Sequence, residues 1–184
     1  LSVFDGENIQ GTWRLTVSDN ASLDFGKLIG WCLTPTFTTT TWNGSVSSSW
    51  TNPSNWTPSS VPNTCGANVV IPAGTLNDPD ISAPTTVGSV DFPSTSVNID
   101  ISSDLTVCGD ITGGGAATFA GTGKVILTGA APTVSANVNF DILRLQNATG
   151  ANLNGAISIY EALELTSGAA NASNLTFKST AVND

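Results

Sequence analysis

The segment that decides the fold runs from residue 105 to residue 165 and repeats one short pattern. It contains Leu105-Thr-Val107, Val125-Ile-Leu127, Leu143-Arg-Leu145 and Leu163-Glu-Leu165, which begin 20, 18 and 20 residues apart. Two residues after each triplet stands a residue that favours a turn: Gly109, Gly129, Asn147 or Ser167. A strand and a turn repeated at this period predict stacked coils rather than a globular sheet. We therefore expect an all-β chain that contains a parallel β-helix, or β-solenoid.

A second set of triplets lies out of phase with the first. Val138-Asn-Phe140, Ile157-Ser-Ile159 and Leu175-Thr-Phe177 begin 19 and 18 residues apart, so each coil should have at least two sheet faces. The apolar ends of a triplet should point inward and its middle residue outward. In the first set this places Arg144 beside Glu164 on adjacent coils. Because the pattern still runs at residue 175, we expect a further coil or a partner to cover the open end.

Residues 65–104 carry shorter apolar runs, such as Val69-Val-Ile71 and Val97-Asn-Ile-Asp-Ile101. Proline interrupts them at positions 72, 79, 84 and 93, and proline is excluded from paired interior strand positions. We expect these residues to form the first, irregular coils.

Composition excludes several classes of function. Of 184 residues only 10% are charged, five of them basic, and the net charge is −9, so no basic surface for nucleic acid can form. No apolar run approaches the roughly 20 residues of a membrane span. Histidine is absent, which excludes histidine-based catalysis within the segment. We expect a segment that is not an enzyme, and the absence of methionine favours a processed piece of a longer protein.

The three cysteines have neither zinc-ligand nor CxxC spacing. A composition rich in Asn, Ser and Thr and poor in Lys is typical of extracellular proteins, in which disulfides persist. Cys65 and Cys108 both flank the start of the solenoid, so we expect them to pair and to fasten the cap to the first coils; two buried thiols are the alternative. Cys32 is then either a small buried apolar residue or the partner of a cysteine further upstream.

All five tryptophans lie in the first 56 residues, and Trp42, Trp50 and Trp56 fall in the segment 42–64. Their spacings of 8 and 6 are even, which places their side chains on one face of an extended chain. An aromatic platform for the sugar rings of an extracellular glycan is one interpretation. We favour a hydrophobic cap over the first coil, because the end of a solenoid otherwise exposes its core.

Residues 1–37 predict two strands, around Trp13–Val17 and Leu28–Phe37, on either side of a polar loop. Gly11-Thr-Trp13, Leu15, Val17, Asp19, Gly26, Leu28, Trp31 and Leu33 follow a recognisable order, together with Phe4 and Gly6. This segment resembles the C-terminal part of a proprotein-convertase P domain, also called the Homo B domain. The resemblance implies the end of a β jelly roll, found beside secreted peptidases and in bacterial surface proteins. Residues 38–41, four consecutive threonines, are interpreted as an extended linker, and residues 42–184 as the cap and solenoid.

The loop of the first segment is the best candidate metal site. Asp19, Asn20 and Asp24, with Asp5 as a further ligand, offer the oxygen donors that Ca²⁺ prefers. The resemblance to secreted P domains favours calcium, whereas an Asp/Asn-rich turn is the simpler interpretation. No cofactor is required by any other motif. Asp78 and Asp80 are interpreted as a solvated turn rather than an acid–base pair, and the glycines around 113–123 lack the helix that a phosphate loop needs.

The Trp-rich head followed by coils gives a second resemblance, over roughly residues 42–184, to repeat modules of large surface proteins of the Bacteroidetes. Such proteins are typically exported by a type IX secretion system. The resemblance implies a secreted, non-catalytic stalk or adhesin-type module at the bacterial cell surface, with secretion-system or surface proteins as partners. The alternatives are an accessory P-domain region of a secreted serine or metallo-peptidase, and a carbohydrate-binding module.

Overall fold

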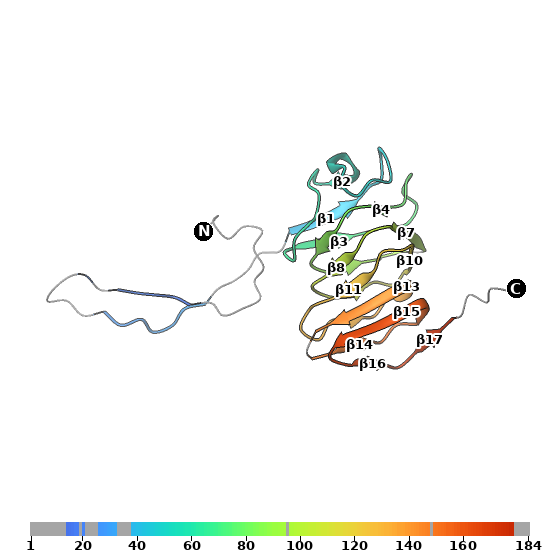
Figure 1. Cartoon of the computed structure of the whole chain (residues 1–184). Helices are drawn as coiled ribbons and strands as arrows, with labels where there is room; N and C mark the ends of the chain where they lie inside the picture. The colour runs from blue at the N-terminus through green and yellow to red at the C-terminus, as the bar shows by residue number, and fades with distance from the viewer. Residues whose placement is uncertain are drawn as a thin grey trace, which may run out of the picture.

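The computed structural model describes residues 14–18, 20, 26–32, 38–94, 96–147 and 149–178. These residues form an all-β structure with no α-helix, in which parallel sheets build a β-solenoid of about five turns. Figure 1 shows the coils stacked one above another between β1 and β17. The fold is therefore the one that the repeated triplets predict.

Each full turn passes through three faces, which agrees with the expectation of at least two. The first face is an eight-stranded sheet that includes the short antiparallel strand β2. Its strands are β1 (Thr38–Trp42), β2 (Trp56–Thr57), β3 (Ala67–Val70), β6 (Val90–Asp91), β9 (Ile111–Thr112), β12 (Thr133–Val134), β14 (Ala151–Leu153) and β16 (Ala170–Ala172). Several of these strands have only two residues, which is too short for a period-2 pattern to be seen in the sequence.

The second and third faces belong to one sheet, because two long strands continue through the corner between them. The strands of the second face are β4 (Asp80–Ile81), β7 (Val97–Ile101), β10 (Ala116–Ala120) and β17 (Leu175–Phe177). The strands of the third face are β5 (Thr85–Val87), β8 (Leu105–Val107) and β11 (Val125–Leu127). Strands β13 (Asn137–Gln146) and β15 (Ile157–Ser167) contribute to both, with a shift in register between Phe140 and Ile142. This shift accommodates the bend at the corner.

The four triplets of the first set stack in parallel register, as predicted. Leu105, Val125, Leu143 and Leu163 form one inward column, and Val107, Leu127, Leu145 and Leu165 form the next. The second set is confirmed as well, since Phe140 pairs with Ile159 and Ile159 with Phe177. Inward side chains from the three faces meet in one continuous apolar core.

Phenylalanine side chains from three successive coils pack against one another in this core. The rings of Phe119 and Phe140 are stacked with centroids 5.5 Å apart, and Phe92 meets Phe119 edge to face at 5.9 Å. All three side chains are completely buried. Aromatic pairs at these separations stabilise a core beyond the area that they bury.

The prolines of residues 65–104 stand at corners and not within strands. Pro72 and Pro93 follow strands β3 and β6, while Pro79 and Pro84 immediately precede β4 and β5. The strands between them pair in regular parallel register, for example Val69 with Val90 and Thr85 with Leu105. The expectation of irregular first coils is therefore wrong, because proline at a corner leaves the ladder hydrogen bonds intact.

The glycine-rich stretch at Gly113–Gly115 is also a corner. A Cβ atom at Gly115 would lie 1.6 Å from the carbonyl oxygen of Ser94 on the preceding coil, so only glycine fits there. Gly113 has φ +124°, a conformation that L side chains rarely adopt. Close stacking of backbone on backbone explains these glycines without a phosphate.

Two predictions for the N-terminal part differ from the structure. The predicted linker, Thr38–Thr41, belongs to strand β1, which pairs in parallel with β3 from Thr38–Ala67 to Thr41–Val70. The threonine tract adopts this strand because β3 offers an open edge, which a local sequence pattern does not show. The second difference concerns the two strands predicted around Trp13–Val17 and Leu28–Phe37. The described residues of this region, 14–18, 20 and 26–32, form no strand. Leu15, Val17, Leu28 and Trp31 are exposed there, and two strands alone cannot bury their apolar faces.

We predict that Phe119→Ala lowers the free energy of unfolding by about 3–5 kcal/mol, since it leaves a cavity between two coils. Urea denaturation followed by circular dichroism measures this change. Asn98→Ala is the matched control: Asn98 is exposed on the outer side of the same face, and its replacement should change stability by no more than about 0.5 kcal/mol. If the two substitutions lowered the free energy of unfolding equally, the result would contradict the placement of Phe119 in the core and of Asn98 on the outer side.

Candidate functional site

The three tryptophans of residues 42–64 lie in the core at the N-terminal end of the solenoid. Trp42, Trp50 and Trp56 are at most 1% exposed. Trp50 and Trp56 meet edge to face with ring centroids 4.6 Å apart, and Trp42 lies 5.0 Å from Trp56. The rings therefore close the first coil, and their buried faces offer no platform to a sugar.

Each indole N–H of this cluster has a backbone acceptor. Trp42 Nε1 donates to the carbonyl of Asn77 at 2.8 Å, Trp50 Nε1 to that of Pro62 at 3.1 Å, and Trp56 Nε1 to that of Trp50 at 2.8 Å. These bonds tie the cap to the loop before β4 as well as to itself. A buried tryptophan whose N–H is satisfied contributes its apolar area without an unmet polar group.

Asn55 is a structural residue of the cap that the sequence analysis did not single out. It is the last residue of the short 3₁₀ turn η2 (Pro53–Asn55) and is completely buried. Its side-chain oxygen accepts from the backbone N–H groups of Val46 and Ser47, and its amide donates to Ser47 Oγ and to the carbonyl of Ser49. One side chain thus holds the loop that carries Trp50 in place. Only its spatial position reveals this role.

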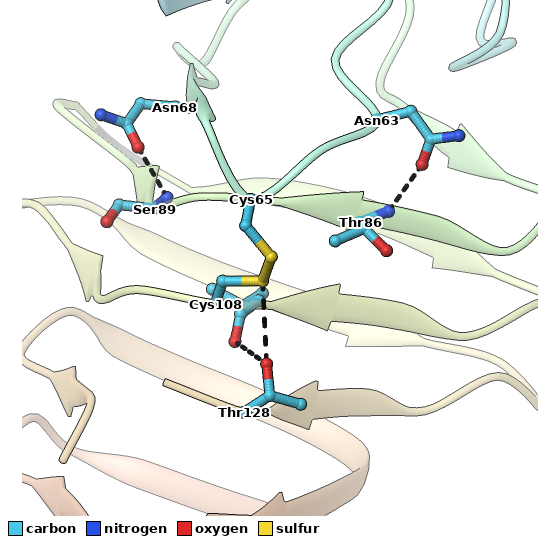
Figure 2. The surroundings of a disulfide bond; sticks show 8 residues. Asn63, Cys65, Asn68, Thr86, Ser89, Cys108 and Thr128 are labelled. Atoms are coloured by element: carbon cyan, nitrogen blue, oxygen red, sulfur yellow. Dashed lines mark hydrogen bonds between the residues drawn. A yellow bond between two sulfur atoms is a disulfide. The ribbon is translucent and has the colours of Figure 1, made fainter. Parts of the chain in front are cut away.

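A disulfide joins Cys65 to Cys108, with the two Cα atoms 5.4 Å apart. Figure 2 shows Cys65 in the segment that enters β3 and Cys108 just after β8, with the Thr128 hydroxyl beneath the sulfur. The bond therefore fastens the segment below the cap to the second coil, 43 residues further along the chain. A disulfide that closes a loop of this length typically stabilises a fold by about 2–4 kcal/mol. Cys32 is exposed, so the expectation of a buried apolar residue there is wrong.

Two asparagines beside the disulfide fasten the cap to the first coil and the first coil to the second. Asn63 Oδ1 accepts from the N–H of Thr86 at 2.8 Å, and Asn68 Oδ1 accepts from the N–H of Ser89 at 2.9 Å (Figure 2). The Asn63 side chain thereby satisfies a backbone donor of β5. It takes the place that a strand of a preceding coil would occupy.

Three charged side chains meet on the outer side of the third face. Arg144 and Glu164 lie side by side on adjacent coils, as predicted, with Arg144 Nε 2.6 Å from Glu164 Oε2. Lys124 Nζ lies 2.7 Å from the other carboxylate oxygen of Glu164, across two coils. Hydrogen bonds from Lys124, which has the larger effect, and from Arg144 lower the pKa of Glu164 below its ordinary value.

Ile126 belongs to the same outward column but is only 8% exposed. It pairs with Arg144 on the next coil, and Lys124 lies two residues earlier on the same side of its strand. Long side chains such as these cover apolar surface with their methylene groups while their charged ends reach solvent. The ion pairs of Lys124 and Arg144 with Glu164 therefore link three successive coils, and we name these three side chains the ionic clasp.

The acidic candidates do not converge on a metal site among the described residues. No group of three or more His, Cys, Asp or Glu side chains there could hold an ion. Asp80 pairs with Asp100 on the next coil, while its backbone bonds to Ser48 and Trp50 of the cap. Asp78 is exposed. Of the predicted calcium ligands Asn20 is exposed, and Asp5, Asp19 and Asp24 lie outside the described residues, so calcium there stays a prediction.

The comparison with protein families gives one finding. The profile of the proprotein convertase P-domain matches residues 1–35. This match covers the segment in which the sequence resembles that domain, and it does not extend to the cap or the coils. No curated protein and no solved structure matches the chain significantly. Together with the β-solenoid, the match is compatible with a non-catalytic module of a larger protein.

We predict that Glu164→Gln lowers the melting temperature at pH 7, because it removes the carboxylate that holds Lys124 and Arg144. Since the pKa of Glu164 is lowered in the folded state, its stabilising effect is present above the ordinary value of 4.5 and is lost as the pH falls through the folded value. The difference in melting temperature should therefore shrink below pH 4.5. Differential scanning calorimetry from pH 3 to pH 8 measures it.

Glu161→Gln is the control for this experiment, because Glu161 is exposed on the same strand. It should leave the melting temperature nearly unchanged at pH 7. If Glu164→Gln lowered the melting temperature by the same amount at every pH, the result would contradict a stabilising role of the ionised Glu164 carboxylate.

Proposed function

We propose that the chain is a non-catalytic stalk module of a secreted cell-surface protein, of the adhesin type, exported by a type IX-like system. The observation that carries the proposal is the capped stack of parallel coils. Its N-terminal end is closed by three buried tryptophans, and a disulfide fastens the cap to the second coil. A stack of this kind is a spacer whose length grows by about 4.8 Å for each coil added.

The outward surface of the second face supports a structural rather than a catalytic role. Its central column is made of short polar side chains from five successive coils: Asn98, Thr118, Asn139, Ser158 and Thr176. One pair of neighbours in it is joined by a side-chain hydrogen bond, from Asn139 Nδ2 to Thr118 Oγ1 at 3.2 Å. Such a ladder reinforces the sheet and keeps its face hydrated without placing a nucleophile beside a base.

The disulfide supports a location outside the cytoplasm, because disulfides persist in oxidising compartments. No helix among the described residues is long and apolar enough to cross a membrane. The proposed export route is supported by the resemblance of the Trp-rich head and coils to those of type IX substrates.

The second candidate is an accessory region of a secreted peptidase. The P-domain match at residues 1–35 favours it, since such domains accompany secreted peptidases. Carbohydrate binding through Trp42, Trp50 and Trp56 loses its basis, because all three side chains are buried.

The proposal is tested on cells that produce the protein. An antibody raised against residues 38–178 should label intact cells, and the labelling should disappear when the type IX export machinery is inactivated. The native polypeptide isolated from the cell surface should not cleave casein. Labelling only after lysis would contradict the surface location, and casein cleavage that co-purifies with the polypeptide would favour the peptidase alternative.

A further inference from the structure

The segment between β2 and β3 covers the first strand of the third face. Residues 58–66 form no strand, and β5 stands at the end of the strand order of its sheet, so this loop lies where a neighbouring strand would be. Pro62 is buried, and its carbonyl accepts from Trp50 Nε1. Asn63 is exposed, and its Oδ1 accepts from the N–H of Thr86. We name residues 58–66 the strap.

Both ends of the strap are anchored independently of the disulfide. Before the strap, β2 pairs with β1, and the Trp56 side chain is buried in the cap. After the strap, β3 pairs with both β1 and β6. The disulfide is attached near the end of the strap, at Cys65, and joins it to Cys108 on the second coil. Breaking the disulfide therefore lets the strap open between two fixed ends, while the tryptophan cluster and the coils stay in place.

The two sulfur atoms of the disulfide differ in their surroundings. Both cysteines are half-buried, so a small thiol in solution can reach the bond. The Thr128 hydroxyl lies 3.7 Å from Cys108 Sγ and 3.5 Å from the carbonyl oxygen of Val107. Figure 2 shows this hydroxyl on the side of Cys108 that faces away from Cys65. A thiolate approaches a disulfide opposite the sulfur that leaves, and its rate depends on access. Thr128 therefore hinders attack on Cys108 and leaves Cys65 as the target.

We propose that the disulfide is a reducible latch on the strap, which a small thiol such as glutathione opens by attack on Cys65. The thiolate of glutathione bonds to Cys65 Sγ, the S–S bond breaks, and its electron pair goes to Cys108 Sγ. The Thr128 hydroxyl donates to the thiolate formed there, and hydrogen bonds to charged groups are stronger than neutral ones.

A second glutathione thiolate completes the reduction. It bonds to the glutathione sulfur on Cys65, and Cys65 leaves as a thiolate in its turn. The two protons that glutathione lost end on the two cysteines, and two glutathione molecules become one oxidised disulfide. Asn63 can then part from the N–H of Thr86, so the strap opens and closes over β5. That the latch closes after the chain leaves a reducing compartment rests on the proposed function, whereas the latch itself does not.

Hydrogen exchange of single amides, followed by NMR in the oxidised and the glutathione-reduced chain, tests the opening of the strap. The Thr86 N–H should exchange at least about tenfold faster after reduction, because its acceptor Asn63 belongs to the strap. The Ser89 N–H is the matched control, since its acceptor Asn68 lies in β3, and its exchange should stay unchanged. Unchanged exchange at Thr86, or equal acceleration at Ser89, would overturn the proposal.

The direction of attack is tested by brief exposure to glutathione, an acid quench and peptide mapping by mass spectrometry. Of the two disulfide cysteines, Cys65 should carry the glutathione, and its appearance on Cys108 instead would overturn the proposal.

The role of the Thr128 hydroxyl is tested by the rate of reduction. Thr128→Val should slow the reduction roughly tenfold, because the leaving thiolate loses its donor, and Thr128→Ser should restore the rate. Thr106→Val is the matched control, since Thr106 is half-buried on the outer side of β8, and it should leave the rate unchanged. A Thr128→Val chain that is reduced as fast as the parent would contradict the role of the hydroxyl. These measurements do not depend on the export route, so failure of the latch and failure of the proposed surface location are distinguishable.

Discussion

The structure depends on one constraint, which is that each coil must place its inward residues directly above those of the coil before it. Parallel strands about 4.8 Å apart satisfy their backbone groups only in fixed register. A slip by one residue would turn every inward side chain outward. The columns from Leu105 to Leu163 and from Val107 to Leu165 keep this register on the third face. The corner glycines allow it, since their backbones lie against the coil before.

Much of the fold could be predicted because this constraint leaves a trace in the sequence. Triplets such as Val125–Leu127 are long enough for apolar and polar residues to alternate, and their spacing gives the period directly. The first face left no such trace, since strands like Thr133–Val134 have two residues. The inward position of Thr85 could not be predicted for another reason. It is a polar residue at an inward position, where its hydroxyl is satisfied by the carbonyl of Ala83.

Other features depend on contacts between distant residues and could not be predicted locally. Thr38–Thr41 become a strand because β3 lies beside them. Ile126 is buried although its position in the triplet faces outward. At the candidate site, the even spacing of the tryptophans indicated one face of an extended chain, whereas the chain folds back between β1 and β2 and brings the three rings together in the core. The role of Asn55 follows only from the four hydrogen bonds that meet at its side chain.

The register of neighbouring coils is the central claim, and engineered cysteine pairs test it most directly. Thr118 and Asn139 are partners on adjacent coils, so Thr118→Cys with Asn139→Cys should form a disulfide on mild oxidation, detected by peptide mapping. Thr118→Cys with Asp141→Cys joins diagonal positions and should remain largely reduced. Preferential cross-linking of the diagonal pair would contradict the register.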